Sequence, residues 1–201
     1  TDVKQAISDN DRYGSTRKAR FGGWGTMSPS NWRYVLHALL SLRQIKTVHG
    51  STCSIVEIGG GYGGLALIIH KLAPTMDVSI TGYTILDLPS VSALQQRYLT
   101  AAGVPEVTCT TLSCFKPGPK DSFLISCYAF SELAPAGGDL GWRKEYRENV
   151  LDPCVSHGFL VWNGDSYGVP LYQFMKNIEM RNTIESPLTS DPSKPNLYVY
   201  F

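Results

Sequence analysis

A glycine-rich turn that directly follows a hydrophobic segment limits the possible folds of this chain more than any other feature. The apolar run Ser54–Ile58 leads into Gly59–Gly64, where five of six residues are glycine, and a helical pattern follows over Gly63–Leu72. Glycine has no Cβ, so the backbone of such a turn can approach a ligand closely, and the amides at the helix start are free to bind it. The order of strand, turn and helix predicts a Rossmann-like α/β fold with a ligand at this turn.

The rest of the chain alternates short β-branched runs with amphipathic segments, which is typical of a mostly parallel sheet with helices on both faces. Further strands are predicted at Asp77–Leu86, Glu106–Thr111, Ser122–Tyr128 and Gly158–Asn163. Helices are predicted at residues 29–50, Gly63–Leu72, Pro89–Ala102, Trp142–Val150 and Leu171–Met180. Two final strand-like runs, Arg181–Glu185 and Leu197–Phe201, predict a hairpin-like end with a C-terminal antiparallel strand. Residues 1–28 show no sustained period and are expected to form an irregular arm or lid.

Length and composition are those of a single globular domain, so residues 1–201 are predicted to form one. The net charge of +1 argues against a nucleic-acid partner. No apolar run reaches the roughly 20 residues that a membrane span needs, and the polar residues 1–10 do not resemble a signal peptide. The five cysteines contain no Cys-x-x-Cys pair, which fits reduced thiols in a cytoplasmic protein.

Glu57 distinguishes between two cofactors that a glycine turn can bind. The spacing Gly59-x-Gly61-x-x-Gly64 also fits the dinucleotide fingerprint, so the glycines alone do not identify the cofactor. Glu57 lies two positions before the first glycine, where a carboxylate repels a pyrophosphate but can bind the amino-acid end of S-adenosylmethionine. The sequence therefore favours S-adenosylmethionine over NAD.

Asp87 is the predicted ribose-binding residue. It follows the second strand, at the sheet edge where ligands of open α/β sheets bind, and a carboxylate there can accept from both ribose hydroxyls. The alternative role, capping the helix that begins at Pro89, is compatible with ribose binding but less favoured. By position, Ser113 and Cys114 are expected to complete an adenine pocket. The full predicted cofactor set is Glu57, Gly59, Gly60, Gly61, Tyr62, Gly63, Asp87, Leu88, Ser113, Cys114 and Tyr128.

Three ordered segments resemble the sugar O-methyltransferase family. They are Val56–Leu65, Tyr83–Pro89 and Leu124–Leu133, and the similarity extends from about Pro29 to the end. The resemblance implies a class I methyltransferase fold, S-adenosylmethionine as donor and a sugar hydroxyl as acceptor. Cys127 stands where relatives often carry Asn, so a family role for an amide there does not carry over. The chain also resembles the methyltransferase domains of multidomain glycan-building proteins of large algal viruses, which suggests a deoxyhexose such as rhamnose.

Methyl transfer from a sulfonium is an in-line displacement, so catalysis depends mainly on positioning, with added help from a general base. Asp165 and Glu132 are the candidate bases, because both follow strands at the predicted site edge; capping a helix or ordering a loop is an equally weighted alternative for each. Tyr128, Asn163 and Trp142 are the candidate acceptor-binding residues, with Trp162 as an alternative to Trp142, although a lone aromatic more often lies in a core.

Neither the histidines nor the acids predict a metal centre. His37 and His70 lie on helical stripes that predict packing, and His157 is expected at the amino end of its strand, away from the site. The acids Asp139, Asp165 and Glu132 show no metal-ligand spacing, so no required metal is predicted.

Two other functions remain open. One is an NAD(P)-dependent oxidoreductase, which shares the glycine spacing; Glu57 and the strand-like end Leu197–Phe201 argue against it. The other is a non-catalytic nucleoside-binding domain that docks neighbouring glycosyltransferases.

Overall fold

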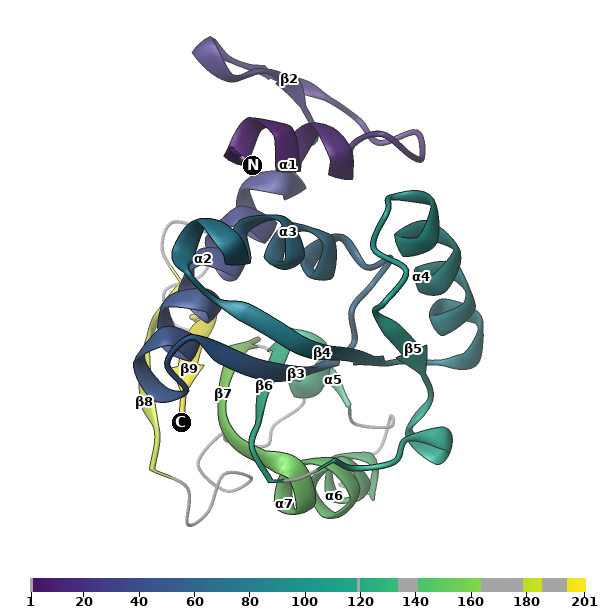
Figure 1. Cartoon of the computed structure of the whole chain (residues 1–201), viewed down its shortest axis with the longest axis vertical. Coiled ribbons are helices and arrows are strands. Elements are labelled where there is room, and N and C mark those ends of the chain that lie inside the picture. Colours follow the sequence, from purple (N-terminus) through teal and green to yellow (C-terminus); the bar gives the residue numbers. More distant parts are fainter. Residues whose placement is uncertain (1, 119, 134–140, 164–178, 186–194) are drawn as a thin grey trace. The chain divides into compact units, whose positions relative to one another are not determined.

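The structure, a computed structural model, describes residues 2–118, 120–133, 141–163, 179–185 and 195–201 (Figure 1). Its strands are β1 (Ala19–Phe21), β2 (Gly25–Met27), β3 (Thr52–Ile58), β4 (Ser79–Leu86), β5 (Thr108–Thr110), β6 (Ser122–Cys127), β7 (Val155–Trp162), β8 (Arg181–Ile184) and β9 (Leu197–Tyr200). Its α-helices are α1 (Val3–Asn10), α2 (Ser30–Val48), α3 (Gly64–Leu72), α4 (Pro89–Ala101), α5 (Ala129–Glu132), α6 (Gly141–Tyr146) and α7 (Asp152–Cys154). Shorter helical turns are η1 (Gly22–Trp24), η2 (Ala73–Met76), η3 (Leu112–Cys114) and η4 (Arg147–Leu151).

The main sheet has the strand order β5-β4-β3-β6-β7-β9-β8. β4 pairs with β5 and β6 with β7 in parallel, whereas β9 is antiparallel to both β7 and β8. The order reverses beside β3, and ligands of open α/β sheets bind at the carboxyl ends of the strands at such a reversal. An antiparallel β9 next to β7 also differs from the six-strand parallel order of dinucleotide-binding folds.

The contacts of the chain group into two compact units, so the prediction of one domain stays a prediction. The first unit comprises Thr1–Ser54 and Gly60–Thr111. In it, α3 is apolar almost throughout and is buried over nearly its whole length, as expected of a helix without a polar face. Helix α2 packs against α3, and α1 packs against both. Helix α4 begins with a proline, which has no amide hydrogen to leave unsatisfied there, and packs against β5.

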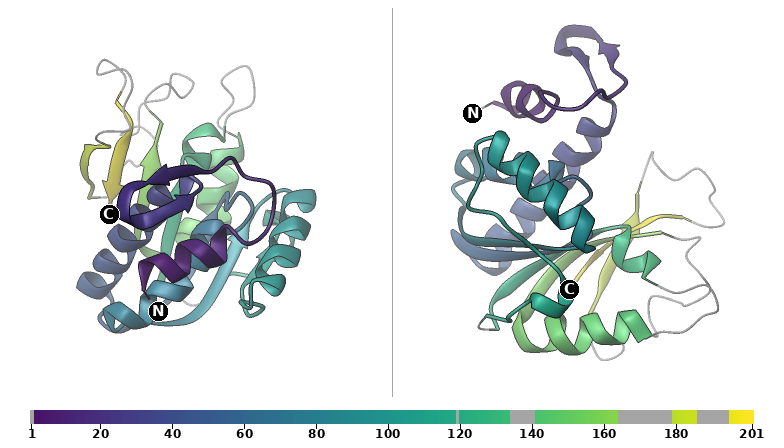
Figure 2. Two further views of the ribbon diagram at one scale, coloured as in Figure 1. Left: turned by 90° about the horizontal axis from the view of Figure 1, so that it is seen from above. Right: turned by 90° about the vertical axis from the view of Figure 1, so that its right-hand side faces the viewer.

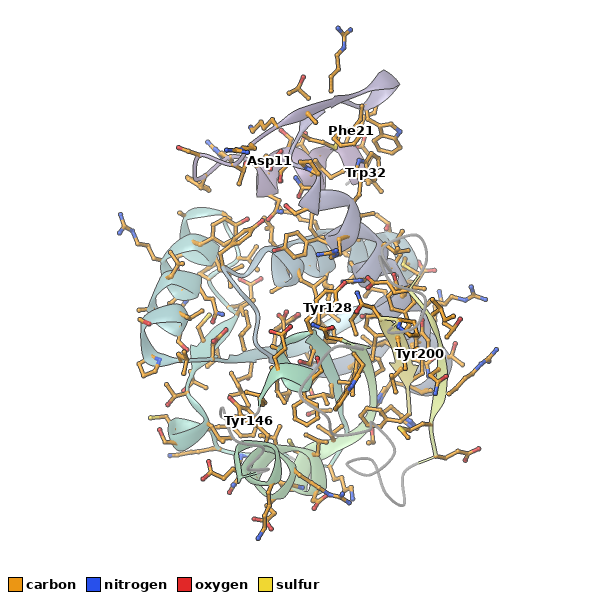
Figure 3. All side chains as sticks on the ribbon, turned by 180° about the vertical axis from the view of Figure 1, so that it is seen from behind. Asp11, Phe21, Trp32, Tyr128, Tyr146 and Tyr200 are labelled. Atoms are coloured by element: carbon orange, nitrogen blue, oxygen red, sulfur yellow. The ribbon has the colours of Figure 1, made fainter. Side chains whose placement is uncertain are left out.

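The expectation of an irregular arm over residues 1–28 is wrong for α1. Asp2 caps this helix by accepting from the Gln5 amide at 2.7 Å, and Ala6 and Ile7 are buried. Periodicity over eight residues is too short to stand out, so the cap and two apolar side chains were missed. The following residues form the β1–β2 hairpin, which lies next to α1 (Figure 2). Lys4 Nζ of α1 donates to the Gly23 carbonyl of this hairpin at 3.0 Å. Phe21 and Trp32 point toward each other, with ring centroids 5.9 Å apart (Figure 3).

The second unit comprises Ile55–Gly59 and Leu112–Phe201. Helices α6 and α7 lie along one face of β6 and β7 (Figure 2). The predicted helix Trp142–Val150 is α-helical only to Tyr146 and continues as the π-helical η4. Pro153 has no amide hydrogen, so it cannot make the regular helical bond to the carbonyl four residues earlier. The Asp152 amide before it donates to the Arg147 carbonyl, five residues earlier, as in a π-helix. Helix Leu171–Met180 falls largely outside the described residues.

The predicted hairpin-like end is confirmed, because β8 and β9 pair antiparallel from Arg181 with Tyr200 to Ile184 with Leu197. All five cysteines lie in the described part of the chain, and none of them forms a disulfide there. Within the described ranges, no helix combines the length and apolar character that crossing a bilayer requires.

Candidate functional site

Several glycines of the turn could not be replaced without disruption, and two of them illustrate why. Gly59 has φ +74°, and a Cβ on it would overlap the Cβ of Ala129 in α5. Gly63 has φ +97° and is the residue before α3, held by a bond from its amide to the Gly60 carbonyl at 2.9 Å. Among the described residues, no side chain caps α3, so no cap occupies its first amides. Such a helix start suits a carboxylate or another anionic group.

Glu57 lies at the carboxyl end of β3 and is 2% exposed. The strand end is fixed within the second unit by Ser126, whose hydroxyl donates to the Ile58 carbonyl at 2.8 Å. The same hydroxyl accepts from the Phe130 amide at 3.0 Å, so it joins the ends of β3 and β6 to α5. A buried carboxylate is therefore placed on a rigid backbone two residues before Gly59.

Three hydrogen bonds within the first unit hold Asp87 in place. Its amide donates to the Thr110 carbonyl at 3.0 Å, which attaches it to the end of β5. Its Oδ1 accepts from the Leu88 amide at 2.9 Å, and its Oδ2 accepts from Gln95 Nε2 at 2.8 Å. Leu88, which is 66% exposed, is the residue before α4, and no described side chain caps that helix. The alternative role of Asp87 as a helix cap is therefore wrong, because the only backbone amide bonded to its carboxylate among the described residues is that of Leu88, which precedes the helix.

Gln95 was not predicted from the sequence. Its Nε2 also donates to the Gly61 carbonyl at 2.8 Å, so it joins Asp87 to the glycine turn. The side chain is fully buried, at 0% exposed. A glutamine on the inner face of a helix directly after the predicted ribose residue was the available signal, but its partners depend on tertiary structure.

Tyr62 points into a network of polar side chains in the first unit. Its hydroxyl accepts from Asn10 Nδ2 at 2.9 Å, and the same nitrogen donates to Asn31 Oδ1 at 2.6 Å. Tyr98 donates to Asn10 Oδ1 at 2.6 Å. Burial raises the pKa of both phenols, above all that of Tyr98. The side chain of Tyr62 thus anchors the glycine turn to α1, α2 and α4, and its role in cofactor binding stays a prediction.

Three strand ends place polar side chains together in the second unit. Cys127 is in register with Val161, and Leu197 is in register with both Trp162 and Ile184. Tyr128, Asn163 and Glu185 are the residues that follow these strand ends. With Glu132 and Tyr198 they form a set that we call the Tyr128 cluster. Glu185 was not predicted as a site residue, although an acid that ends a predicted strand was the signal.

Tyr128 is held in a conformation that few side chains adopt. It has φ +70° and ψ −42°, a strained region for a residue other than glycine. Its amide donates to the Val161 carbonyl at 2.8 Å, and its hydroxyl donates to Glu185 Oε2 at 2.6 Å. Tyr198 donates to Glu185 Oε1 at 3.3 Å, and Glu185 is 0% exposed. Burial, and then the charge of Glu185, raises the pKa of Tyr198. Strain of this kind is often retained at functional sites.

Glu132 and Asn163 are brought together at the same sheet edge. Asn163 Nδ2 donates to Glu132 Oε1 at 3.1 Å, and the Asn163 amide donates to the Ser131 hydroxyl at 3.1 Å. Ser131 in turn donates to the Tyr128 carbonyl at 2.6 Å. Glu132 is exposed, so it is accessible to a ligand while it also bonds Asn163, the residue after β7.

Other predicted residues lie elsewhere. Trp162 is 4% exposed with its ring against Phe130, so it belongs to the core and not to a sugar-binding surface. Ser113 and Cys114 are exposed on η3, and their role in an adenine pocket stays a prediction. Trp142 lies in α6, but its side chain is outside the described part of the chain. Asp139 and Asp165 lie wholly outside the described residues.

The three histidines considered in the sequence analysis lie within helices or a strand. His37 is buried in α2, His70 pairs with Glu106 at 3.1 Å, and His157 lies near the start of β7. Over the described ranges, no group of three or more His, Cys, Asp or Glu side chains is arranged to hold a metal ion. Independence from metals stays a prediction.

Comparison with solved structures identifies the fold. The plantazolicin methyltransferase BpumL in complex with SAH matches with a TM-score of 0.55 at 14% identity, over 84% of this chain and 82% of that one. A SAM-dependent methyltransferase from Aquifex aeolicus matches with a TM-score of 0.51 at 11% identity, over 86% of this chain and 92% of that one. Some similar structures are longer: the chain spans 48% of a protein from Galdieria sulphuraria assigned as a sarcosine dimethylglycine methyltransferase. No family model and no curated protein matches the chain.

The chain therefore has the Rossmann-like class I methyltransferase fold, with a mostly parallel seven-stranded sheet and an antiparallel C-terminal strand. This confirms the fold class predicted from the sequence.

Proposed function

We propose that the chain is an S-adenosylmethionine-dependent O-methyltransferase that methylates a sugar hydroxyl. The observation that carries this proposal is the order of Glu57, the glycine turn and Asp87, each at the end of a strand of a methyltransferase fold. A solved structure with the same fold, BpumL, is described in complex with SAH, the demethylated product of the donor. The donor is supported by this likeness and by the charges at the turn.

Each predicted donor residue has a distinct role in this proposal. The amide groups of Gly59–Gly63 and the buried carboxylate of Glu57 receive the amino-acid end of the donor, with Glu57 suited to its ammonium group. Asp87 receives the ribose hydroxyls, because each of its two oxygens retains lone pairs after the bonds from Leu88 and Gln95. Leu88, Ser113 and Cys114 face the adenine. The bound donor supplies an electrophilic methyl group on its sulfonium.

The acceptor is assigned to the Tyr128 cluster and Trp142. Tyr128 and Asn163 orient the acceptor hydroxyl, and Glu132 or Asp165 removes its proton as the C–O bond forms and the C–S bond of the donor breaks, with the electron pair left on sulfur. Glu132 is exposed and already bonded to Asn163, which fits a base beside an orienting amide. A sugar acceptor, with a deoxyhexose such as rhamnose first among candidates, rests on the family resemblance of Val56–Leu65, Tyr83–Pro89 and Leu124–Leu133. Neighbouring glycosyltransferase domains are proposed partners on the same ground.

A thermal-shift panel tests the donor. S-adenosylmethionine and S-adenosylhomocysteine should raise the melting temperature, whereas NAD and NADP should not, because a ligand that binds only the folded state stabilises it. A response to NAD alone would replace the proposal with an oxidoreductase, and no response to any nucleotide would favour a docking domain.

Product analysis tests the reaction. Incubation with isotopically labelled S-adenosylmethionine and a panel of free, nucleotide-linked and glycan-bound sugars should give a product heavier by one labelled methyl group in mass spectrometry. A chain that binds the donor but labels none of the sugars would refute the sugar assignment. Turnover should survive dialysis against a strong chelator, and loss of turnover restored by magnesium would show that a metal is required.

A further inference from the structure

Gln95 joins two parts of the proposed donor site, and both bonds lie inside the first unit. It projects from α4, and its Nε2 donates to the Gly61 carbonyl at 2.8 Å and to Asp87 Oδ2 at 2.8 Å. Its side chain is 0% exposed, so neither bond competes with bulk water. One amide nitrogen therefore links the middle of the glycine turn to the carboxylate that ends β4.

The orientation of this amide follows from its partners. A carbonyl and a carboxylate only accept hydrogen bonds, so the nitrogen, and not the oxygen, has to face them. The Gln95 oxygen is buried and has no hydrogen-bond partner among the residues that the structure describes. Leaving a buried acceptor unpaired is unfavourable, yet turning the amide would place its oxygen against two other acceptors, which is worse. The observed orientation is the one that holds Asp87 and Gly61.

The bonds to Asp87 fix both of its oxygens. Oδ1 accepts from the Leu88 amide at 2.9 Å, and Oδ2 accepts from Gln95. The backbone is fixed as well, since the Asp87 amide and the Ser92 hydroxyl both donate to the Thr110 carbonyl, at 3.0 and 2.9 Å. Asp87 is half-buried, so its carboxylate remains accessible while it cannot rotate freely.

We propose that Gln95 is a positioning residue of the donor site. It holds the Asp87 carboxylate in the orientation that receives the two ribose hydroxyls, and it keeps the glycine turn at a fixed distance from that carboxylate. The inference rests on the proposed function, because it assumes that Asp87 binds a ribose. Affinity is gained because the site is ordered before the ligand arrives.

The substitution Gln95→Met tests this role, because methionine has a similar length and cannot donate. We expect a loss of affinity for S-adenosylhomocysteine of about 10-fold to 100-fold, the range for a lost bond to a charged group, measured by calorimetry. Gln96→Met is the matched control: its amide, in the next position of α4, contacts the Thr100 hydroxyl at 3.5 Å on the exposed side. This control should leave the affinity unchanged.

A pair of ligands separates positioning from general damage to the fold. Adenosine carries both ribose hydroxyls, whereas 2′,3′-dideoxyadenosine carries neither, and both are measured by competition against S-adenosylhomocysteine. Gln95→Met should weaken the binding of adenosine and leave the binding of 2′,3′-dideoxyadenosine nearly unchanged. The orientation of Asp87 matters only for a ligand that has ribose hydroxyls. Gln95→Glu keeps the side-chain shape and places a second carboxylate against Asp87, so it should show the same selective loss. It also supplies the comparison if Gln95→Met does not fold.

The outcomes distinguish this inference from the proposed function. If the unmodified chain binds none of these nucleosides, the donor assignment itself fails. If the unmodified chain binds them and Gln95→Met weakens both adenosine analogues equally, or neither, then the function stands and the positioning role of Gln95 is refuted.

Discussion

At the scale of single residues, the Asp87 carboxylate accepts two hydrogen bonds within the protein and keeps further lone pairs for a ligand. Leu88 and Gln95 each use one lone pair of its oxygens, and the lone pairs that remain are directed by those bonds. The helix-capping role is ruled out by the same bonds, since the Leu88 amide precedes α4. The ribose role of this acid stays a prediction, and it is tested as follows.

Replacing Asp87 by asparagine should therefore damage ligand binding more than stability. Asp87→Asn removes the charge that strengthens bonds from hydroxyls, so affinity for S-adenosylhomocysteine should fall by about 10-fold or more in calorimetry. Asp77→Asn is the control, because Asp77 is an acid on the surface whose side chain is 88% exposed and pairs with Lys46. Equal affinities for the two variants would contradict the assignment of Asp87.

Tyr128 and Glu185 should show their coupling in unfolding experiments. Tyr128→Phe removes a donor from a buried carboxylate, and we expect it to lower the free energy of unfolding by about 1.5–3 kcal/mol in urea. In a chain that also carries Glu185→Gln, the same change should cost less, because the partner is then uncharged. Identical costs in both backgrounds would mean that the 2.6 Å contact contributes no coupling.

At the scale of elements, Gly59 and α5 are fitted to each other within the second unit. A Cβ on Gly59 would overlap Ala129, whereas a Cβ on Gly61 would have no atom of the described residues within 4 Å, although both glycines have positive φ. Gly59 is therefore required by packing and by backbone conformation, and Gly61 by conformation alone.

Alanine substitutions should separate these two requirements. Gly61→Ala should cost about 1 kcal/mol, the usual penalty for a left-handed backbone. Gly59→Ala should cost at least about 2 kcal/mol more, because either β3 or α5 has to move. Urea unfolding of the two variants gives the comparison, and a smaller loss for Gly59→Ala would show that α5 is not seated against the turn.

Local patterns were sufficient to predict most elements of the fold. The strand ahead of Gly59, the acid after β4 and the final hairpin follow from periodicity, glycine content and residue type, which act over a few neighbouring residues. Helix α1 was missed because it has only two buried apolar side chains among its eight residues. Gln95 and Glu185 were missed for a different reason: each has a partner far away in the chain, Gly61 at 34 residues for Gln95 and Tyr128 at 57 residues for Glu185. Such contacts depend on the folded topology, and a single sequence carries no record of them.

At the scale of the whole molecule, several buried phenols make stability depend on pH. Burial raises the pKa of Tyr62, Tyr98 and Tyr198 above the ordinary value of 10.0, and for Tyr198 the charge of Glu185 adds to the effect. Below pH 10.0 the phenols are protonated in both states, so their contribution is complete. As the pH rises above 10.0, the unfolded chain loses these protons first, and stability falls until the raised pKa values of the folded chain are passed.

Urea unfolding at pH values on either side of 10.0 measures this loss. Tyr98→Phe should reduce the slope of stability against pH, even though it lowers stability overall by removing a bond to Asn10. A slope that Tyr98→Phe does not change would place the alkaline loss in other groups.

The bond between Asn10 and Tyr62 has a consequence for the first helix of the chain. The glycine turn and α1 share this polar contact. A ligand that restricts the motion of the turn therefore also restrains α1, which the ligand need not contact. Amide protons of residues 6–10 should then exchange with deuterium more slowly when the turn is occupied. The beginning of the chain would thereby report on events at a distant loop.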